Sequence, residues 1–402
     1  MPNTNPDTTA TPADADQAGA ILEIDLDALG ANYNNLRHRA APAECGAVLK
    51  ADAYGLGADQ VGPKLAALGC HSFFVAHLAE GVALRHILGG EPAIYILNGP
   101  LPRTEADFLH HDLLPVLNSP RQLEQWSAAA AIHGQTLGAG LQIDTGMARL
   151  GLSPVETAEL AANPGRLAGL DLHFIASHLA CADEPGHAFN GEQRQAFQQQ
   201  LTALPPAPGS LANSAGIFLG PDYHYDLVRP GIALYGGNPT PGAANPMGSV
   251  VRLAGKIIQI REIDTPQSVG YGATHRVTGR RRIATIPVGY ADGYPRALSG
   301  RGRAGFAGVS VPVVGRVSMD LITLDVTEAP VDATYPGAMV DLIGGGGPSL
   351  DEVAEAAGTI GYEILTALGR RYYRQYLPVP KYPDEEPGAR TGPHAGPQEG
   401  PR

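Results

Sequence analysis

The sequence contains little cysteine and no long apolar run, and each shortage excludes a class of protein. Its three cysteines, Cys45, Cys70 and Cys181, are odd in number and widely spaced. Such spacing fits neither a disulfide framework nor a paired-cysteine zinc site, and it suits a reducing compartment. No stretch approaches the roughly 18 consecutive apolar residues of a membrane span. The first 20 residues also hold none of the Lys or Arg that open a secretory signal. We therefore expect a cytoplasmic protein with no membrane segment.

Positive charge is scarce as well. The chain has 28 Lys and Arg against 40 Asp and Glu, which gives a formal net charge of -12. This balance, without a basic cluster that reverses it locally, argues against a nucleic-acid partner. No group of His, Cys, Asp or Glu has the spacing of metal ligands, so we expect no metal site. The composition, 44% hydrophobic and 17% charged, is that of a globular protein with a substantial core. Work on a small molecule is the function class that remains.

Composition divides the 402 residues into four parts. Residues 1–20 and 381–402 are rich in Pro, Gly or charge, offer little to bury and are predicted to be disordered. Between them the pattern changes around a Gly- and Pro-rich linker, which predicts two domains, residues 21–238 and 239–380. The second of these has strand-like segments separated by Gly and Pro turns and one helical segment over residues 349–369. It is therefore predicted to be mainly β.

In the first domain, short apolar runs alternate with segments whose apolar residues recur near a 3.6-residue spacing, as strands alternate with helices. Ser119, and Ser153 with Glu156 three residues later, are typical helix starts. Eight strands separated by helices over about 220 residues match a (β/α)8 TIM-like barrel in number and size. A doubly wound open sheet is the competing α/β fold. The predicted strands lie in residues 46–51, 72–77, 93–98, 113–118, 137–145, 170–178, 210–213 and 225–236.

Polar side chains recur where the predicted barrel strands end, and in a barrel the loops at those ends carry the functional groups. A cationic rim with hydroxyls and glycines suits a phosphorylated ligand, because hydroxyls and backbone N–H groups bind phosphate. From the residues alone Lys50 has two interpretations, a lysine that snorkels to solvent or a desolvated amine that attacks a carbonyl. The residues at these ends are Lys50, Arg149, His178, Asn213, Ser214, Arg229 and Gly231.

Eight motifs in a fixed order favour the second interpretation. By these motifs, and over residues 23–371, the chain resembles bacterial alanine racemases, which use pyridoxal 5'-phosphate (PLP) as cofactor. The resemblance implies that Lys50 carries PLP covalently through its amine. The motifs are "AVLKADAYGLG" (47–57), "IDTGMARLG" (143–151), "ANSAG" (212–216), "VRPGIALYG" (228–236), "VGYGATH" (269–275), "IPVGYADGYPR" (286–296), "VGRVSMD" (314–320) and "GTIGYE" (358–363).

The resemblance also implies how the cofactor is held. Arg229 would face the pyridine nitrogen, and Arg149 would lie near the phenolic oxygen and the substrate carboxylate. Tyr54 would pack near the phosphate, and His178 and Asn213 would belong to the cofactor site. The positions that match phosphate contacts are Ser214, Gly231, Ile232 and Tyr362.

Two proton-transfer groups are implied for racemisation of an amino acid. Lys50 would act on one face of the substrate, and Tyr271 of the partner subunit in a homodimer would act on the other. The backbone N–H of Met319 would bind the substrate carboxylate. Because tyrosine titrates near 10, its use at neutral pH requires positive potential, which a His178–Arg229 pair could supply.

The chain departs from the family pattern at three positions. Many members have a lysine, often carbamylated, where this chain has Gln142, and that lysine positions the arginine equivalent to Arg149. An amide forms no carbamate, so we expect an inorganic anion, most simply chloride, between Gln142 and Arg149, with a direct hydrogen bond as the alternative. Ser318 and Ser210 stand where Cys and His are common, and both are expected to tune packing.

The leading function implied by the resemblance is that of an alanine racemase that supplies D-alanine for peptidoglycan. A racemase for serine or for a wider range of amino acids is the alternative on the same scaffold, and pocket volume decides between them. A PLP-carrier protein without turnover would resemble the barrel alone, whereas this chain keeps the β domain and Tyr271. Barrel-type PLP decarboxylases share the architecture, but their glycine-rich phosphate motif and catalytic cysteine are not found.

Overall fold

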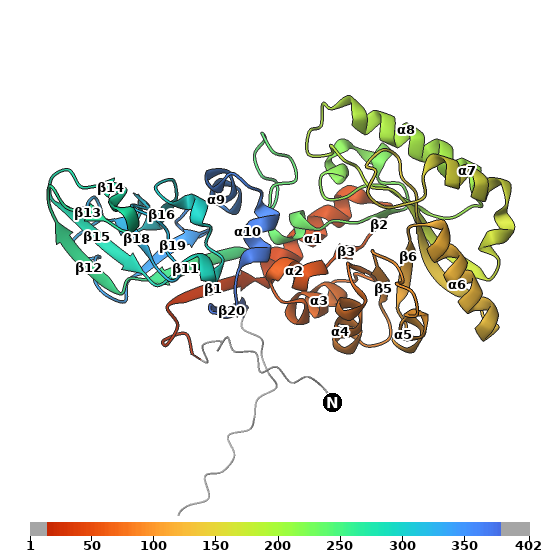
Figure 1. The fold of residues 1–402 in the computed structure, drawn as a ribbon, viewed down its shortest axis with the longest axis horizontal. Coiled ribbons are helices and arrows are strands. Elements are labelled where there is room, and N and C mark those ends of the chain that lie inside the picture. The colour runs from red at the N-terminus through yellow and green to blue at the C-terminus, as the bar shows by residue number, and fades with distance from the viewer. Residues whose placement is uncertain (1–13, 379–402) are drawn as a thin grey trace, which may run out of the picture.

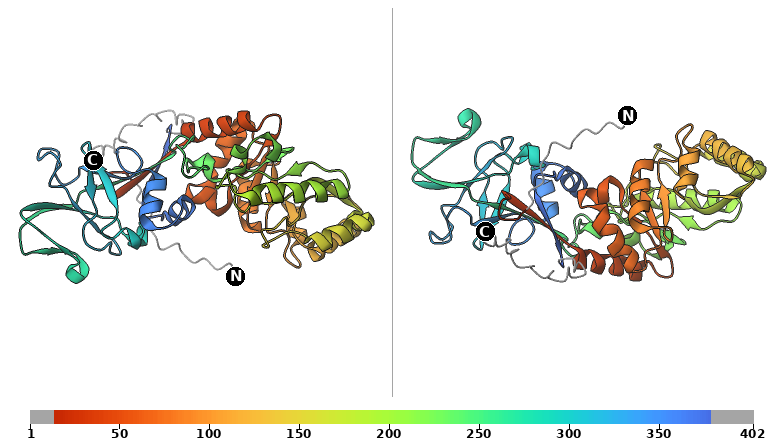
Figure 2. Two further views of the ribbon diagram at one scale, coloured as in Figure 1. Left: turned by 90° about the horizontal axis from the view of Figure 1, so that it is seen from above. Right: turned by 90° about the horizontal axis from the view of Figure 1, so that it is seen from below.

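The computed structural model describes residues 14–378, which fold into two parts placed end to end (Figure 1). One part is a ring of parallel strands with helices around it, and the other consists mainly of antiparallel strands. Figure 2 shows the same elongated, two-part outline from above and from below. None of the helices in the described residues is both long enough and apolar enough to cross a membrane.

The first part is a barrel whose strands follow one another in sequence order. Strands β3 to β9 form one parallel sheet, and β10 pairs in parallel with β2. The ring closes on both sides of β10, because Asp226 N donates to Gly209 O and Val48 N donates to Pro230 O, each at 3.0 Å. The predicted barrel is confirmed, and the open doubly wound sheet is excluded. The strands are β2 (Glu44–Cys45), β3 (Ala47–Val48), β4 (Ser72–Val75), β5 (Ala93–Ile96), β6 (Leu114–Leu117), β7 (Leu137–Gln142), β8 (Leu170–Ala176), β9 (Gly209–Ser210) and β10 (Leu227–Val228).

Helices cover the outside of this barrel (Figure 1). Both predicted helix starts are confirmed: Ser119 Oγ accepts from Gln122 N at 3.3 Å, and Ser153 and Glu156 form a capping box. Such side chains satisfy N–H groups that have no partner inside the helix. The helices are α1 (Leu26–Ala40), α3 (Ala58–Ala67), α4 (Leu78–Leu88), α5 (Glu105–His110), α6 (Pro120–His133), α7 (Pro154–Ala162) and α8 (Ala188–Ala203).

The barrel interior is packed rather than open. The rings of Phe74, Tyr95 and Phe174, from three different strands, lie with centroids 4.9–5.9 Å apart, and all three residues are buried. Aromatic rings at these separations attract one another in tilted or offset arrangements. Because side chains fill the barrel, a ligand can enter only from the ends of the strands.

Within residues 14–378, the second part contains three sheets and two α-helices. The largest sheet has six strands in the order β17-β16-β19-β11-β1-β20, and β12, β15 and β18 form a second sheet. A small hairpin, β13 with β14, carries the segment around residue 271. The predicted mainly β character of this part is confirmed. Its elements after the linker are β11 (Val251–Lys256), β12 (Gln259–Ile263), β13 (Ser268–Val269), β14 (His275–Arg276), β15 (Arg281–Ile286), β16 (Arg303–Phe306), β17 (Val309–Pro312), β18 (Ile322–Asp325), β19 (Met339–Ile343), α9 (Leu350–Ala357), α10 (Gly361–Ala367) and β20 (Tyr373–Leu377).

The first strand of the chain, β1 (Ala20–Asp25), belongs to the sheet of the second part. It pairs antiparallel with β11 and parallel with β20. Residues 14–19 before it also have defined contacts, since Lys256 Nζ donates to Ala15 O at 2.6 Å. The expectation of a disordered tail over residues 1–20 is therefore wrong from residue 14 onward, and the barrel part begins after β1 rather than at residue 21. Residues 1–13 and 379–402, which include the tail expected at 381–402, lie outside the described residues.

Candidate active site

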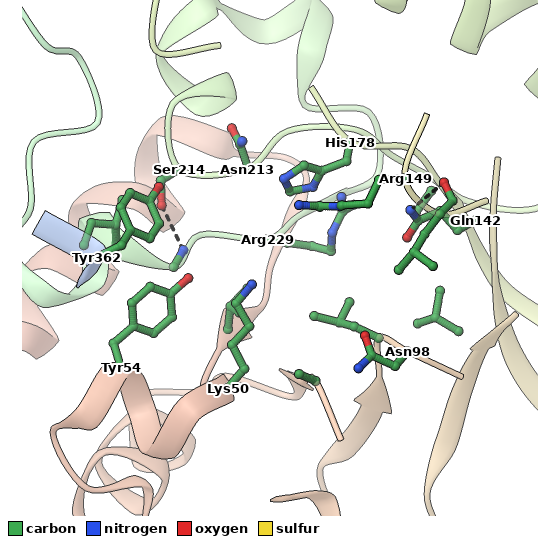
Figure 3. A pocket seen from close by; sticks show the side chains of 18 of the residues that line it. Lys50, Tyr54, Asn98, Gln142, Arg149, His178, Asn213, Ser214, Arg229 and Tyr362 are labelled. Atoms are coloured by element: carbon green, nitrogen blue, oxygen red, sulfur yellow. Dashed lines mark hydrogen bonds between the residues drawn. The ribbon is translucent and has the colours of Figure 1, made fainter. Parts of the chain in front are cut away.

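A cavity of about 340 Å³ lies at the carboxyl-terminal end of the barrel strands (Figure 3). Helix α10 of the second part supplies one side chain, and the others come from the barrel. The polar groups that the barrel rule selected are thus brought to one place. The cavity is lined by all ten residues that the sequence placed in the cofactor site: Lys50, Tyr54, Arg149, His178, Asn213, Ser214, Arg229, Gly231, Ile232 and Tyr362.

Lys50 reaches the cavity from an unusual piece of backbone. It opens α2 (Lys50–Gly55), in which residues 51–54 have φ between 53° and 57° and therefore form a left-handed turn. This conformation costs about 1–2 kcal/mol for each residue other than glycine, so the surrounding structure must hold it. The turn is joined to the next helix, because Asp52 Oδ1 accepts from the backbone N of Ala58, the first residue of α3, at 2.8 Å. Figure 3 shows the Lys50 side chain pointing from this turn into the cavity.

The surroundings of Lys50 favour its neutral amine. Burial lowers the pKa of Lys50, and the positive charge of Arg149 lowers this pKa further. The Glu80 carboxylate acts in the opposite direction and raises it. A neutral amine is the form that attacks a carbonyl or accepts a proton. The structure therefore supports the second of the two interpretations of Lys50.

Beside Lys50, the chain forms a small cradle with little room for side chains. Ser214 Oγ accepts hydrogen bonds from Gly231 N at 2.8 Å and from Ala233 N at 3.3 Å. A Cβ added at Gly231 would lie 2.2 Å from Tyr54 Oη, so any larger residue there would force the tyrosine or the loop to move. The rings of Tyr54 and Tyr362 pack at a centroid distance of 5.8 Å. Hydroxyls and backbone N–H groups that meet at such a point suit the oxygens of a phosphate.

Arg229 is a buried cation held by neutral acceptors. Its Nη1 donates to Ser210 O at 2.9 Å, and its Nη2 donates to Ser177 O at 2.7 Å. It also contacts Ser210 Oγ, whose hydroxyl donates to Leu227 O at 2.6 Å. Burial lowers the pKa of Arg229 to about 10, which leaves the guanidinium charged at neutral pH. Ser210 is buried, and beyond the expected effect on packing its carbonyl and hydroxyl contact Arg229.

His178 is held in its neutral form. Desolvation by the surrounding protein lowers the pKa of His178 to about 3, and the charges of Arg229, Arg149 and Lys50 act in the same direction. A neutral imidazole has one donor and one acceptor nitrogen. His178 can therefore pass on a hydrogen bond within the site, but the positive potential comes from the arginines and not from an imidazolium.

Gln142 has a partner inside its own loop. Its Nε2 donates to Leu150 O at 3.3 Å, next to Arg149 in the sequence. Among the hydrogen bonds of residues 14–378, none joins Gln142 directly to Arg149. The structure thus favours neither the direct bond nor any other group that would orient Arg149.

Sequence reasoning missed part of the cavity wall. Asn98 follows β5 just as Arg149 follows β7, so the same strand-end rule would have selected it. Its Nδ2 lies 3.3 Å from His77 Nδ1. Apolar residues in the wall carry no such signal, because they look like ordinary strand residues. The lining residues that were not predicted as site residues are Val48, Ala76, Leu97, Asn98, Val116, Gln142, Leu150, Phe174 and Ala176.

Two predicted site residues do not line the cavity of this chain. Tyr271 lies in the second part and is 73% exposed, and Met319 is 54% exposed. Gly270 and Gly272, with φ of 74° and 72°, flank Tyr271 and turn the backbone sharply on both sides of it. Tyr290, close to Met319 through the hydrogen bond from Ala291 N to Met319 O, is also exposed. These side chains are available to a second molecule.

Two family models match the chain, one in each part of the structure. The model described as "Alanine racemase, N-terminal domain" matches residues 24–239, and the model described as "Alanine racemase, C-terminal domain" matches residues 250–376.

Similar proteins carry the same description over their whole length. An alanine racemase of Rhodospirillum rubrum is 52% identical over 90% of this chain and 96% of its own. A protein of Mesorhizobium japonicum named "Alanine racemase, catabolic" is 48% identical over 92% of this chain and 96% of its own. Among solved structures, an alanine racemase from Bartonella henselae with covalently bound pyridoxal phosphate is 41% identical, with a TM-score of 0.86 over 90% of this chain and 100% of that chain. One from Streptomyces coelicolor is 34% identical, with a TM-score of 0.85 over 91% of this chain and 100% of that one.

Proposed function

This chain belongs to the alanine racemase family, and from that premise we propose that it interconverts L-alanine and D-alanine with PLP bound at Lys50. The observation that carries the proposal is the cavity at the barrel mouth. There a lysine with a lowered pKa lies among two arginines and a glycine cradle. An amine, an anion cradle and fixed cations are what a phosphorylated carbonyl cofactor requires.

The residues of the cavity fit PLP. Ser214, Gly231, Ile232 and Tyr362 would hold its phosphate, with Tyr54 packed beside them, in the cradle that an added Cβ would fill. When bound, PLP supplies an electron sink that stabilises the negative charge left on the substrate α-carbon after loss of a proton. Arg229 has donors and no acceptor, so any nitrogen that it faces is kept unprotonated.

Proton transfer falls to two residues on opposite faces of the substrate. Lys50, whose lowered pKa favours the neutral amine, accepts the α-proton on one face or returns it there. Arg149 orients the substrate carboxylate with its planar guanidinium, which forms paired hydrogen bonds to carboxylates. The second base is Tyr271 of the partner subunit, and Met319 of the partner subunit adds a backbone N–H for the carboxylate. The exposure of Tyr271 and Met319, and their absence from the wall of this chain's cavity, support a homodimer with shared sites.

We further propose that chloride lies between Gln142 and Arg149 and orients the guanidinium. The support is chemical: Gln142 is uncharged, and its amide nitrogen is already near this loop through the bond to Leu150 O.

We place the enzyme in the cytoplasm and assign it the supply of D-alanine for peptidoglycan. A catabolic role is the second candidate, because relatives from Mesorhizobium japonicum and Agrobacterium fabrum bear that word in their names. A deletion strain that needs added D-alanine would decide for supply.

The proposed function is tested by a racemisation panel with purified protein. Alanine, serine and larger amino acids are offered as single enantiomers, and the opposite enantiomer is measured. We expect alanine to react fastest, and a preference for serine or a flat profile would favour the alternative substrate range. Borohydride reduction of the PLP-loaded protein, followed by peptide mass spectrometry, should find the cofactor on Lys50. A label on another lysine, or none, would contradict the assignment of the site.

A further inference from the structure

Glu80 links the turn that carries Lys50 to the next helix of the barrel. It is the third residue of α4, and its Oε2 accepts from Ala76 N at 2.8 Å and from His77 N at 2.9 Å. Its other oxygen, Oε1, accepts from Ala51 N at 2.7 Å. One carboxylate therefore binds three backbone N–H groups, and one of these belongs to the residue that follows Lys50. Hydrogen bonds to an ionised acceptor are about twice as strong as neutral ones.

The left-handed turn needs such support at both ends. At its far end, β20 of the second part provides two bonds: Arg374 Nη1 donates to Gly55 O at 2.6 Å, and Tyr376 Oη donates to Leu56 O at 2.9 Å. At its near end, Glu80 binds Ala51, the first residue with positive φ. Without these contacts an Ala-Asp-Ala-Tyr segment would favour right-handed backbone. The Lys50 side chain would then no longer point into the cavity.

We propose that Glu80 is a positioning residue for Lys50: its carboxylate holds the left-handed turn at Ala51 and so directs the lysine amine toward the cofactor. The hold of Glu80 on the turn is independent of the proposed function, and only its effect on the bonding of Lys50 to PLP rests on that function. The purely structural alternative is that Glu80 does no more than cap α4. Both roles use the same carboxylate, but they use different oxygens.

The chain offers a matched control for the capping role. Glu156 occupies the same position in the capping box of α7, where its Oε2 accepts from Ser153 N at 2.8 Å. Among the hydrogen bonds of residues 14–378, none joins Glu156 to a residue of the cavity wall. Glu80→Gln and Glu156→Gln thus each remove one charge from a capping box, and only the first disturbs the turn. Loss of the Glu80 charge by itself lowers the pKa of Lys50 further and favours bonding, so slower bonding in Glu80→Gln reports on the turn.

Three measurements on these two variants test the proposal. Hydrogen exchange of the PLP-free protein reports on the peptide covering residues 49–57. The absorbance change on adding PLP gives the rate at which Lys50 bonds to it, and thermal unfolding gives stability. We expect Glu80→Gln to speed exchange in that peptide about tenfold and to slow bonding to PLP about tenfold. We expect Glu156→Gln to lower the melting temperature about as much as Glu80→Gln does, and to change neither the exchange rate nor the bonding rate.

Equal exchange and equal bonding rates in the two variants would overturn the proposal and leave Glu80 as a helix cap. If Glu80→Gln does not fold, Glu80→Asp decides. Its shorter side chain keeps the cap but cannot also reach Ala51, so it should show the fast exchange with a melting temperature near that of the unchanged protein. Slow exchange in Glu80→Asp would again overturn the proposal. Absence of racemisation by the unchanged protein would contradict the proposed function instead, and the exchange result would be unaffected by it.

Discussion

Arg229 illustrates how single residues set the electrostatics of the site. It is 7% exposed, yet the acceptors that hold it are the carbonyls of Ser177 and Ser210 and the Ser210 hydroxyl, all uncharged. A carboxylate partner would cancel the charge, whereas neutral acceptors fix the guanidinium and leave its positive potential in place. Ser210 thereby acquires a role that its position before the "ANS" motif did not reveal.

The histidine of the site should make stability depend on pH. The pKa of His178 is lowered to about 3, while a histidine in an unfolded chain titrates near 6.5. Between these values the unfolded chain binds a proton that the folded chain does not, so stability falls as the pH falls from about 6.5 to about 3. We expect His178→Gln to flatten the fall in melting temperature of the PLP-free protein between pH 6.5 and pH 4.5.

The exposed His133 at the end of α6 provides the control for this experiment. His133→Gln should leave the pH dependence of the melting temperature as it is in the unchanged protein. Parallel curves for all three proteins would show that the neutral state of His178 contributes nothing to the acid sensitivity of the fold.

Activity should respond to chloride if an anion orients Arg149. At constant ionic strength we expect chloride added to the dialysed enzyme to raise the racemisation rate about fivefold, the gain of one charge-assisted contact. Bicarbonate should have no effect, because Gln142 cannot form a carbamate. In Gln142→Lys we expect chloride to have no effect and bicarbonate to raise the rate, because a lysine can form a carbamate. A rate independent of chloride, with no density beside Arg149 in a crystal, would leave the direct hydrogen bond as the better account.

Seven of the ten cofactor-site residues could be predicted because polar groups and a glycine follow the strand ends, whereas Tyr54, Ile232 and Tyr362 were implied only by the family resemblance. The ten predicted cofactor-site residues lie together in one cavity, although their individual roles remain proposals. Glu80 could not be predicted in its role at Lys50. In the sequence it has the spacing of an ordinary helix cap, and its bond to Ala51 depends on how two successive loops of the barrel meet.

At the scale of elements, the cradle combines a short loop with the tyrosine of the lysine turn. The chain passes from Gly231 directly into a 3-10 turn, Ile232–Tyr235, while Tyr54 lies against it from the other side. The ring of Tyr54 also packs on Tyr235 at a centroid distance of 4.7 Å. Two separate elements thus meet where a side chain at residue 231 would have to be.

A single methyl group should therefore disturb cofactor binding. In Gly231→Ala the new Cβ would lie 2.2 Å from Tyr54 Oη, so the tyrosine or the loop must move. Such overpacking costs about 1–3 kcal/mol, and we expect the dissociation constant for PLP, measured by absorbance titration, to rise about tenfold or more. Gly191→Ala in α8, where an added Cβ meets open space, should bind PLP normally. Equal affinities in both variants would show that the close approach is not needed.

Element types were more predictable than element partners. The alternation of strands and helices, and the starts of α6 and α7, follow from local patterns in the sequence. The left-handed turn after Lys50 could not be predicted from local patterns, because its residues favour right-handed backbone and contacts distant in sequence impose the turn. The place of β1 is also hidden, because an apolar alternating strand at residues 20–25 suits either domain and its partners come more than 200 residues later.

At the scale of the whole molecule, the two residues proposed for proton transfer belong to different parts. Lys50 lines the barrel cavity, whereas Tyr271 projects from the far part and is exposed. The Tyr271 hydroxyl, on a turn between two glycines, is free to reach a site on a second molecule. A dimer in which each second part covers the other chain's barrel mouth accounts for both observations.

Subunit exchange tests this arrangement. Lys50→Ala and Tyr271→Phe should each abolish activity, and the two inactive proteins, mixed in equal amounts and allowed to exchange, should regain about a quarter of the normal rate. Half of the dimers are then mixed, and one of the two sites in each has both bases. Light scattering or labelled subunits must show that exchange has occurred. Persistent inactivity after proven exchange would place both bases within one chain.

The position of β1 has a consequence for biosynthesis. This strand leaves the ribosome before the barrel, and its Leu22 and Ile24 are fully buried in the folded protein, but its neighbours β11 and β20 emerge only after the barrel. The barrel is translated in between and can form while β1 still waits for them. The nascent chain therefore carries β1 as an unpaired strand until β11 and β20 have emerged, and a fragment that starts at the linker lacks an inner strand of its sheet. Separate expression of the second part requires that β1 be supplied, for instance by joining residues 14–25 to its end through a circular permutation.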